Sequence, residues 1–209
     1  MSYVGKKFPN IAVNAMSEMG DTFKLNVFEE ATQKNKKVVL FWYPKDFTFV
    51  CPTELHAFEE AKAEFEKRNT LVIGASCDTA EVHFAWLNTS KDNGGIEGVS
   101  YPLLADTTRE LAEALDILDI VYEGTEEDYT VKGDNVTYRA TYLLDETGTV
   151  FHESINHMPL GRNVNEFLRL IDAMTHLQKH GEVCPANWEE GKDAMSATRD
   201  GVADYLSKH

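Results

Sequence analysis

The stretch that decides the fold is residues 37–68, KVVLFWYPKDFTFVCPTELHAFEEAKAEFEKR. Within it, residues 38–43 form an unbroken apolar, β-branched and aromatic run, which is typical of a strand buried on both faces. Pro44 ends this run, and after a short loop apolar side chains recur at helical spacing between Leu55 and Phe65. The stretch therefore predicts a buried strand, a loop and an amphipathic helix in succession.

Cys51 stands where this predicted helix begins. Proline is favoured at the first helical position, so Pro52 marks the helix start and places Cys51 at the N-cap. A thiol at that position faces unpaired backbone N–H groups and the positive end of the helix dipole, and both favour the thiolate over the thiol. The sequence thus predicts a reactive cysteine.

Composition narrows the class of protein. The chain has 209 residues, of which 43% are hydrophobic, and this suits one α/β domain with an appendage. A formal charge of −15 and a pI near 4.8 argue against nucleic acid and anionic membranes as partners. Residues 1–16 lack an apolar stretch of signal-peptide length, and no run of about 18 apolar residues occurs. We therefore expect a cytoplasmic protein.

The remaining cysteines and histidines offer no metal motif. Cys51, Cys77 and Cys184 lie too far apart for a zinc ribbon or a dense disulfide framework. Cys77 ends a predicted buried strand, so we interpret it as a packing residue. His176 and His180 have helical i, i+4 spacing, but they lack the glutamate of the zinc-protease motif and a third ligand. We expect a solvated helix end there and no metal.

Strand and helix patterns alternate along the rest of the chain, which indicates a parallel sheet. Strands are predicted at residues 70–77 and 101–105 and a hairpin at residues 138–155, with helices at residues 79–88, 107–117 and 163–180. Residues 123–135 are acidic and contain glycine, so we expect a surface excursion there. Residues 181–209 have no strong period and predict an arm that packs on something else.

This order of elements is that of a thioredoxin-like domain, but a plain thioredoxin would carry C-x-x-C at the helix start. The pattern Pro44-x-x-x-Thr48-x-x-Cys51 instead resembles the active-site signature of the peroxiredoxins, and FWYPKDFTFVCPTE is similar to typical two-cysteine members throughout. The resemblance continues in HFAWLNT, YPLLAD, RATYLLD and GEVCPANW, and its closest subgroup is the peroxidase subunit of alkyl hydroperoxide reductase.

The resemblance implies an α/β, thioredoxin-like fold with a central mixed sheet flanked by helices. It implies a peroxidase core over residues 1–163, a final core helix over residues 164–180, and an extended arm over residues 181–209 that carries a resolving cysteine. The implied activity is reduction of hydrogen peroxide and organic hydroperoxides by a thiol, without a cofactor. Antioxidant defence and redox homeostasis would be the role of such an enzyme.

Peroxide reduction by a thiol needs an anionic sulfur and hydrogen-bond donors for the oxygens. A free thiol is only a few per cent ionised at pH 7, and a helix terminus supplies about 0.3 to 2 kcal/mol. A cation is therefore needed as well. By resemblance this cation is Arg139, which would donate to both sulfur and peroxide, although taken alone it would be interpreted as a surface charge.

The resemblance assigns the other site residues too. Thr48 is the hydroxyl that serves the reacting oxygens, and Pro44 shields the thiolate from water. Glu54 and Arg162 match positions that orient the catalytic arginine through ion pairs. Cys184 lies in GEVCP and matches the resolving cysteine, although by itself it would be interpreted as a free thiol.

In the typical two-cysteine class the resolving thiol comes from the partner chain, so the implied unit is a homodimer, and family members assemble further into decamers. The implied electron donor is thioredoxin or a dedicated flavoprotein disulfide reductase. A thiol–disulfide oxidoreductase would need the missing C-x-x-C. An oligomeric holdase chaperone is the alternative function from another class.

Two departures from the family pattern bear on over-oxidation. The Gly-Gly-Leu-Gly loop is one residue longer here, at residues 94–98, and the tail carries Tyr205-Leu206 where sensitive members have Tyr-Phe. In the family these two elements pack together and slow the unfolding of the active-site helix. We therefore expect this protein to resist over-oxidation.

Overall fold

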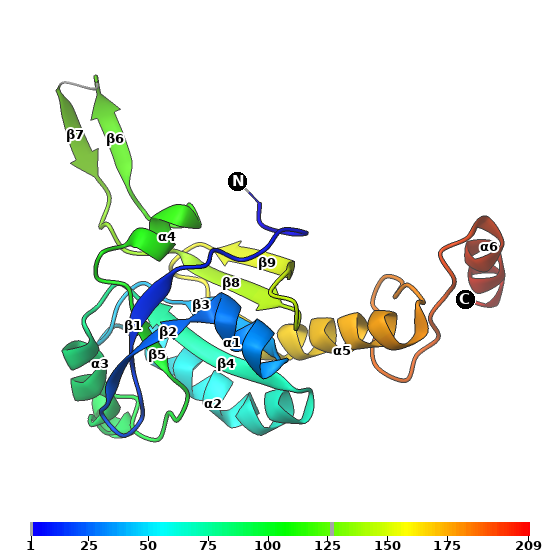
Figure 1. Ribbon diagram of the computed structural model, residues 1–209, viewed down its shortest axis with the longest axis horizontal. Helices are drawn as coiled ribbons and strands as arrows, with labels where there is room; N and C mark the ends of the chain where they lie inside the picture. Colours follow the sequence, from blue (N-terminus) through cyan, green and yellow to red (C-terminus); the bar gives the residue numbers. More distant parts are fainter. Residues whose placement is uncertain (1, 126–127) are drawn as a thin grey trace. The chain divides into compact units, whose positions relative to one another are not determined.

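The computed structural model describes residues 2–125 and 128–209, and within them a seven-stranded mixed sheet carries helices on its faces (Figure 1). The strand order is β2-β1-β5-β4-β3-β8-β9, with β3, β4 and β5 parallel and the other pairs antiparallel. The strands are β1 (Ala12–Met16), β2 (Thr22–Asn26), β3 (Lys37–Trp42), β4 (Thr70–Ser76), β5 (Leu103–Ala105), β8 (Arg139–Leu144) and β9 (Val150–Asn156).

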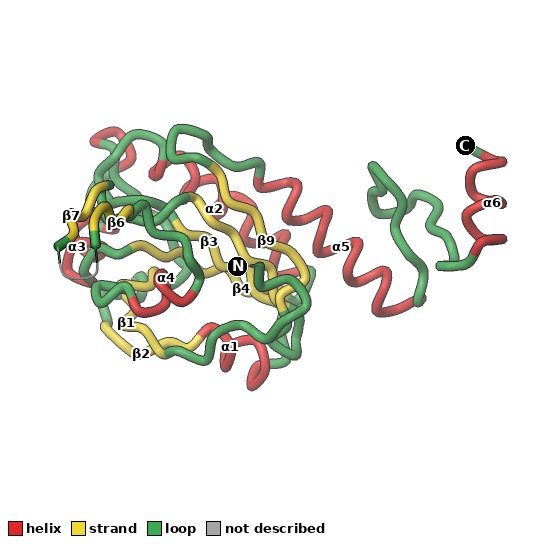
Figure 2. Tube along the Cα trace, turned by 90° about the horizontal axis from the view of Figure 1, so that it is seen from above, coloured by secondary structure: helices red, strands yellow, loops and turns green. Residues whose placement is uncertain are grey.

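The helices and the remaining strands complete the order of elements. They are α1 (Val27–Lys34), α2 (Cys51–Lys67), α3 (Ala80–Leu87), the 3₁₀ turn η1 (Lys91–Asn93), α4 (Glu110–Ala114), β6 (Val121–Gly124), β7 (Tyr129–Lys132), α5 (Val164–His180) and α6 (Arg199–Lys208). The predicted α/β, thioredoxin-like class with a central mixed sheet flanked by helices is confirmed. Figure 2 shows that loop occupies most of the chain between α5 and α6.

The central strand β3 is buried on both faces, as its unbroken apolar sequence predicts. Because side chains alternate along a strand, Leu40 and Trp42 join the apolar cluster that also contains the buried positions of α1 and α4. Phe41 points the other way and stacks on Phe58 of α2 with ring centroids 3.9 Å apart. Two layers of helices are thereby fixed to one strand.

Helix α2 begins one residue earlier than the sequence predicted. Val50 is the N-cap, with φ −84° and ψ −35°, and Cys51 is the first helical residue instead of the cap. The Val50 carbonyl accepts hydrogen bonds from the backbone N–H groups of Thr53 and Glu54 at 3.1 and 3.3 Å. The thiol still lies in the first turn, where unpaired N–H groups and the helix dipole favour an anion.

Two other predicted elements differ from the structure. The helix predicted for residues 107–117 is reduced to α4, because Arg109 at its N-cap has a left-handed backbone with φ 61°. The tail at residues 181–209, predicted only as an arm without a strong period, ends in α6. Thr198 caps that helix by accepting a hydrogen bond from the N–H of Gly201. None of its residues is buried, so no apolar stripe marked it in the sequence.

The acidic surface excursion predicted at residues 123–135 is exposed at residues 123–125 and 128–134, and it contains regular structure. Strands β6 and β7 pair antiparallel into a hairpin that projects away from the main sheet (Figure 1). Every residue of both strands is exposed. Residues 126–127, between the two strands, lie outside the described residues.

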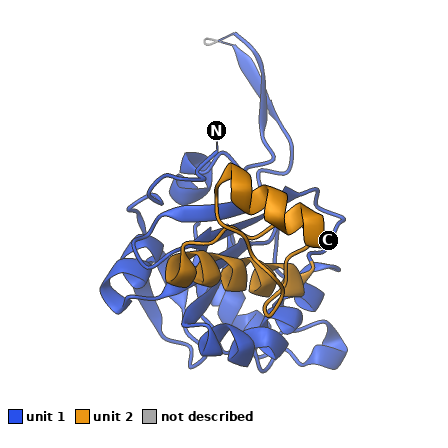
Figure 3. Cartoon of the chain, turned by 90° about the vertical axis from the view of Figure 1, so that its right-hand side faces the viewer, with its two compact units in different colours: residues 1–162 blue, residues 163–209 orange. Residues whose placement is uncertain are grey.

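The chain forms two compact units, residues 1–162 and residues 163–209 (Figure 3). The first contains the main sheet, and the second contains α5, the loop after it and α6. Asn163 caps α5 and Gly181 ends it in a left-handed conformation with φ 69°, as the sequence predicted. The functional division with boundaries at residues 163 and 180 remains a prediction.

Candidate active site

Cys51 is placed by the loop that connects β3 to α2. The N–H of Tyr43 donates to the carbonyl of Ala75, which extends the β3–β4 ladder up to Pro44. The loop then turns through Phe47, whose φ of 53° is left-handed, and returns the chain to the start of α2. Because β3 is fixed on both faces, the end of this strand gives the loop a rigid base.

The Cys51 sulfur is fully buried and has two hydrogen-bond donors beside it. Thr48 Oγ1 lies 2.9 Å from Sγ, and Arg139 Nη1 lies 3.4 Å from it. Thr48 Oγ1 is also 2.9 Å from the carbonyl oxygen of Lys45, and a hydroxyl has one proton, so it can donate to only one of these acceptors at a time. The threonine hydroxyl can therefore donate its proton either to the sulfur or to the loop carbonyl.

A buried ion-pair cluster supports the arginine. Glu54 Oε2 accepts from Arg139 Nη1 at 2.6 Å and from Arg162 Nη2 at 2.8 Å, while Glu54 Oε1 accepts from Arg162 Nε at 2.8 Å. All three side chains are at most 4% exposed. Two guanidinium groups share one carboxylate, so the cluster has one positive charge in excess. A thiolate at Cys51 would balance it, in a place where charges are poorly screened.

Strand register explains how Arg139 comes to lie beside Cys51, 88 residues away in sequence. Arg139 is the first residue of β8, which pairs antiparallel with β3 so that Thr141 lies opposite Phe41. Arg139 precedes Thr141 by two residues. Because the two strands run in opposite directions, it lies beside the C-terminal end of β3, where the Cys51 loop begins. Its Nε donates to the carbonyl of Met158 at 2.6 Å, which holds the guanidinium plane.

These residues line an open cavity of about 480 Å³. Four predicted site residues, Pro44, Thr48, Cys51 and Arg139, meet in its wall, and Glu54 and Arg162 lie directly behind the arginine. The other lining residues, which the sequence did not point to, are Lys45, Phe49, Val50, Asp134, Val136, Met158 and Pro159. A small hydroperoxide in this cavity would meet the sulfur, a hydroxyl and a guanidinium together.

A buried aspartate–histidine pair, which was not predicted from the sequence, holds the loop between β3 and α2. Asp46 lies between Pro44 and Thr48, and its Oδ2 lies 2.7 Å from Nδ1 of His83, a fully buried residue of α3. His83 Nε2 lies 3.1 Å from the carbonyl oxygen of Leu104. With an acceptor on each nitrogen, the ring satisfies both by holding both protons, as an imidazolium.

Burial alone would lower the pKa of His83, but the hydrogen bond and the charge of Asp46 outweigh it and raise that pKa. Burial also raises the pKa of the Asp46 carboxyl, against the hydrogen bond from His83. We describe the Asp46–His83 pair as ionic because an acceptor faces each of the two ring nitrogens. From the sequence, His83 shares a helix face with Trp86 and Leu87 and so resembles an ordinary core position.

Cys184 lies in the second unit, where an antiparallel bridge between Val183 and Met195 closes a loop after it. Its Sγ donates to the carbonyl of Ala173 at 3.6 Å. Partial burial raises the pKa of Cys184, although the nearby Arg169 acts in the opposite direction. Trp188, 2% exposed, anchors the loop, since its carbonyl accepts from Arg169 Nη1 at 3.0 Å.

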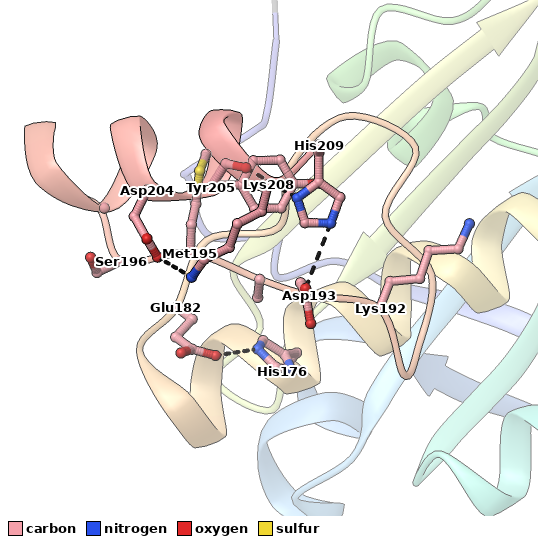
Figure 4. A pocket seen from close by; sticks show the side chains of 12 residues that line it. His176, Glu182, Lys192, Asp193, Met195, Ser196, Asp204, Tyr205, Lys208 and His209 are labelled. Carbon is pink, nitrogen blue, oxygen red and sulfur yellow. Dashed lines mark hydrogen bonds and ion pairs between the residues drawn. The ribbon is translucent and has the colours of Figure 1, made fainter.

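A second cavity, of about 540 Å³, lies within the second unit and contains none of the predicted site residues (Figure 4). His176 Nε2 and Glu182 Oε2, 2.9 Å apart, form one side of it. The ring of His180 lies beside that of His176, with centroids 4.6 Å apart and the ring planes tilted by 38°. Within the described residues, no three histidine, cysteine or carboxylate side chains are grouped as metal ligands.

Cys77 differs from both other cysteines. It packs against the apolar cluster that contains Leu40 and Trp42, and burial, with the charge of Asp106 adding to it, raises its pKa to about 12. Its surroundings therefore keep it a neutral thiol at physiological pH, which agrees with a packing residue.

Among the described helices, none combines the length and the apolar character that crossing a membrane would require.

A thiol at a helix start, with a hydroxyl and an arginine converging on its sulfur, is the arrangement expected of a thiol peroxidase. Comparison with known proteins agrees. Residues 4–153 match the AhpC/TSA family, and residues 173–208 match the C-terminal domain of 1-Cys peroxiredoxin. The chain therefore belongs to the AhpC/TSA family of peroxiredoxins, and the predicted relationship to alkyl hydroperoxide reductase C is confirmed.

Individual relatives cover nearly the whole chain. Alkyl hydroperoxide reductase C of Helicobacter pylori is 44% identical over 172 residues, which are 82% of this chain and 80% of the relative. Peroxiredoxin-1 of Gekko japonicus is 40% identical over all of this chain and 97% of its own length. The crystal structure of reduced Plasmodium vivax 2-Cys peroxiredoxin superposes with a TM-score of 0.89, at 37% identity, over 99% of this chain and 100% of that one. The chain is accordingly a peroxide-reducing peroxidase with an antioxidant role.

Proposed function

We propose that Cys51 is the peroxidatic cysteine and reduces hydrogen peroxide and organic hydroperoxides. Its thiolate attacks one peroxide oxygen, the S–O bond forms as the O–O bond breaks, and the leaving oxygen takes a proton. The products are a sulfenic acid at Cys51 and water or an alcohol. The observation that carries the proposal is the convergence of Thr48 Oγ1 and Arg139 Nη1 on a buried sulfur that lines an open cavity.

The surrounding residues would act on the charge that moves in this reaction. Arg139 stabilises the anionic sulfur and then the leaving oxygen, while Thr48 donates first to the sulfur and then to an oxygen. Glu54 and Arg162 position Arg139, and Pro44 limits the access of water to the sulfur. Donors that are fixed in advance are worth more than mobile ones, because they need not reorganise as the charge develops.

We further propose that Cys184 of a second copy resolves the sulfenic acid. Its thiol condenses with the Cys51 sulfenic acid, a disulfide forms and water leaves. A disulfide needs Cα atoms within about 7 Å, so the first turn of α2 has to unwind and the tail has to release. The minimal unit is then a homodimer with two sites, and a decamer is the expected larger assembly.

Regeneration of the disulfide needs an external two-electron donor. We propose thioredoxin or a dedicated flavoprotein disulfide reductase for this step, and a cytoplasmic location where such donors operate. In this scheme residues 1–163 are the peroxidase core, residues 164–180 its last helix, and residues 181–209 the arm that delivers Cys184.

Two variants test the assignment. Cys51→Ser should abolish peroxide consumption, followed with dithiothreitol as reductant. Cys184→Ser should still react with one equivalent of peroxide but should not give the Cys51–Cys184 dimer on non-reducing electrophoresis. Absence of a disulfide-linked dimer in the unchanged protein after peroxide treatment would refute the two-cysteine scheme.

The same Cys51→Ser variant separates the peroxidase from an oligomeric holdase. A holdase acts through exposed apolar surface and does not need the sulfur, so its suppression of client aggregation should survive the substitution. If Cys51→Ser lost both peroxide consumption and suppression of aggregation, the holdase activity would depend on the peroxidase and would not be a separate function.

Hydrogen exchange tests the proposed unwinding. The amides of the first turn of α2 should be protected in the reduced protein and exchange faster in the disulfide form. Equal protection in the two forms would refute local unwinding as the step that admits Cys184, and with it our expectation that this step governs over-oxidation.

A further inference from the structure

The β6–β7 hairpin has one apolar face without a described neighbour. Its register pairs Tyr122 with Val131 and Gly124 with Tyr129, and because side chains alternate along strands, the two tyrosines and Val131 lie on the same face. They are 60%, 53% and 51% exposed, and the tyrosine rings meet edge to face with centroids 5.4 Å apart. We call this set the tyrosine face.

The opposite face of the hairpin is polar except for Val121. It carries Val121, Glu123, Thr130 and Lys132, and the last of these pairs with Glu123 at 2.6 Å. A two-stranded hairpin is at best marginally stable in water without a partner for its apolar side. Exposed apolar clusters with a polar surround mark interaction surfaces. The tyrosine face thus has the composition of a binding surface.

The base of the hairpin is firmly held and reaches the Cys51 cavity. Asp119 N donates to the carbonyl of Val136 at 2.8 Å, and the hydroxyl of Tyr138 donates to Asp119 Oδ1 at 2.8 Å. Gly133, with φ 97°, passes so close to the Asp119 carbonyl that any larger residue would clash. Asp134 and Val136 line the same cavity as Cys51. The hairpin therefore rises from the rim of the peroxide site.

Charge indicates what kind of partner fits. Among the described residues of this segment, Asp119, Glu123, Asp128 and Asp134 are acidic and Lys132 alone is basic. The same hairpin of a second copy carries the same carboxylates and would be repelled at short range, whereas a basic surface would be attracted. The proposed reaction also requires one external protein to visit this rim in every cycle, namely the donor that reduces the disulfide.

We propose that the tyrosine face and the carboxylates around it dock the protein dithiol that regenerates the enzyme, through a partly apolar, basic surface beside the donor's reactive sulfur. This inference rests on the proposed function. In the step it serves, a donor thiolate attacks the Cys51–Cys184 disulfide to give a mixed disulfide and one free thiol. The second donor thiol then displaces the remaining cysteine, so the donor loses two electrons and both peroxidase cysteines regain their protons.

The test compares a protein donor with a small one. Turnover of hydrogen peroxide is measured with thioredoxin, thioredoxin reductase and NADPH, with a flavoprotein disulfide reductase and NADH, and with dithiothreitol. The protein donor that better supports the unchanged enzyme is used for the variants. The test variant is Tyr122→Ser with Tyr129→Ser, and the matched control on the polar face is Val121→Ser with Thr130→Ala.

In the tyrosine-face variant, KM for the protein donor should rise about tenfold, since buried aromatic anchors dominate interface affinity. The control should stay within about twofold of the unchanged enzyme, and dithiothreitol-supported turnover should be the same in all three proteins. Raising the salt concentration should increase KM of the unchanged enzyme, because the attraction of the carboxylates is screened. Asp128→Asn should weaken that salt dependence.

Several results would overturn the proposal. They are an unchanged KM for the protein donor in the tyrosine-face variant, an equal rise in the control, or an absence of turnover with both protein donors. A change in sedimentation of the variant would assign the face to a second copy instead. Failure of the unchanged enzyme with dithiothreitol would refute the proposed peroxidase function itself, which separates the two outcomes.

Discussion

The surroundings of Cys51 and Cys184 differ in what they do to a thiol. Cys51 is fully buried, and its sulfur lies 2.9 Å from a hydroxyl and 3.4 Å from a guanidinium. Cys184 is partly exposed, its sulfur donates to a backbone carbonyl, and burial raises its pKa. The first environment supplies hydrogen-bond donors to the sulfur, whereas the second favours the protonated thiol. The two sulfurs thus differ in their surroundings in the way that the proposed roles of attacking and resolving thiol require.

Removing the cation beside Cys51 should have the largest effect. Arg139→Met deletes a donor to the sulfur and leaves Glu54 with one guanidinium, so the second-order rate constant for peroxide should fall by about 10²- to 10³-fold. Rapid mixing with hydrogen peroxide measures this step without any reductant. Arg139→Lys keeps the charge without the forked geometry, so its rate constant should lie between those of the unchanged enzyme and Arg139→Met. A loss below threefold in Arg139→Met would show that the helix start alone activates the thiol.

Breaking the Asp46–His83 pair should have the second-largest effect. His83→Asn leaves the Asp46 carboxylate buried without its cation and should lower the free energy of unfolding by about 3 kcal/mol in urea. Asp46→Asn should cost a similar amount, and the double variant should cost less than the sum. Additive effects would show that the two side chains do not stabilise the loop as a pair.

The effect of His83 should depend on pH in a defined direction. Its pKa is raised in the fold, so the contribution of the pair is complete below about pH 6.5, the ordinary value for histidine, and is lost as pH rises through the folded pKa. The deficit of His83→Asn relative to the unchanged protein should therefore shrink at alkaline pH. A deficit that grows with pH would contradict an imidazolium at this position.

On the arm, removing the nearby cation should have a smaller effect. Arg169 lowers the pKa of Cys184 against burial, so Arg169→Met should raise that pKa and slow disulfide formation about threefold near neutral pH. Quenched-flow sampling on non-reducing gels measures this rate after a peroxide pulse. The reaction of Cys51 with peroxide should be unaffected, and a matching loss there would contradict separate roles for the two arginines.

The smallest effect is expected at Cys77. With a pKa of about 12, less than about 0.1% of this thiol is ionised at pH 7, so Cys77→Ala should leave both rates within twofold. In the native protein, Cys77 should also resist iodoacetamide for longer than Cys51, which mass spectrometry of digests can follow. Rapid labelling of Cys77 would show that the strand end opens.

Local chemistry was predictable where the reacting groups are neighbours in sequence. Pro52 and the helical pattern after it indicated a reactive thiol at Cys51, and because Pro44, Thr48 and Cys51 lie within one short segment, that segment could be compared with the signature of a family. Arg139 could not be found in that way, because its approach depends on the register between β8 and β3. It was predicted through resemblance to a family, and the structure gives the physical reason for its place.

Features that depend on tertiary pairing were missed. The Asp46–His83 pair joins a loop to a helix, and a single histidine on an apolar helix face looks like a core residue. The hairpin at β6 and β7 was expected only as a surface excursion, because acidic residues and glycines obscure its short alternation. The N-cap of α2 was misplaced by one residue, since Pro52 occupies the second helical position instead of the first.

The clamp on Glu54 also has a thermal consequence. Cys51 and Glu54 share the first turn of α2, and two arginines hold that carboxylate, so unwinding the turn has to break several buried ionic contacts at once. Steps of this kind have large activation enthalpies and slow steeply on cooling. Attack on peroxide requires no such opening and should slow less. The sulfenic acid should therefore live longer in the cold, and a second peroxide should over-oxidise a larger share of the enzyme at low temperature than at high.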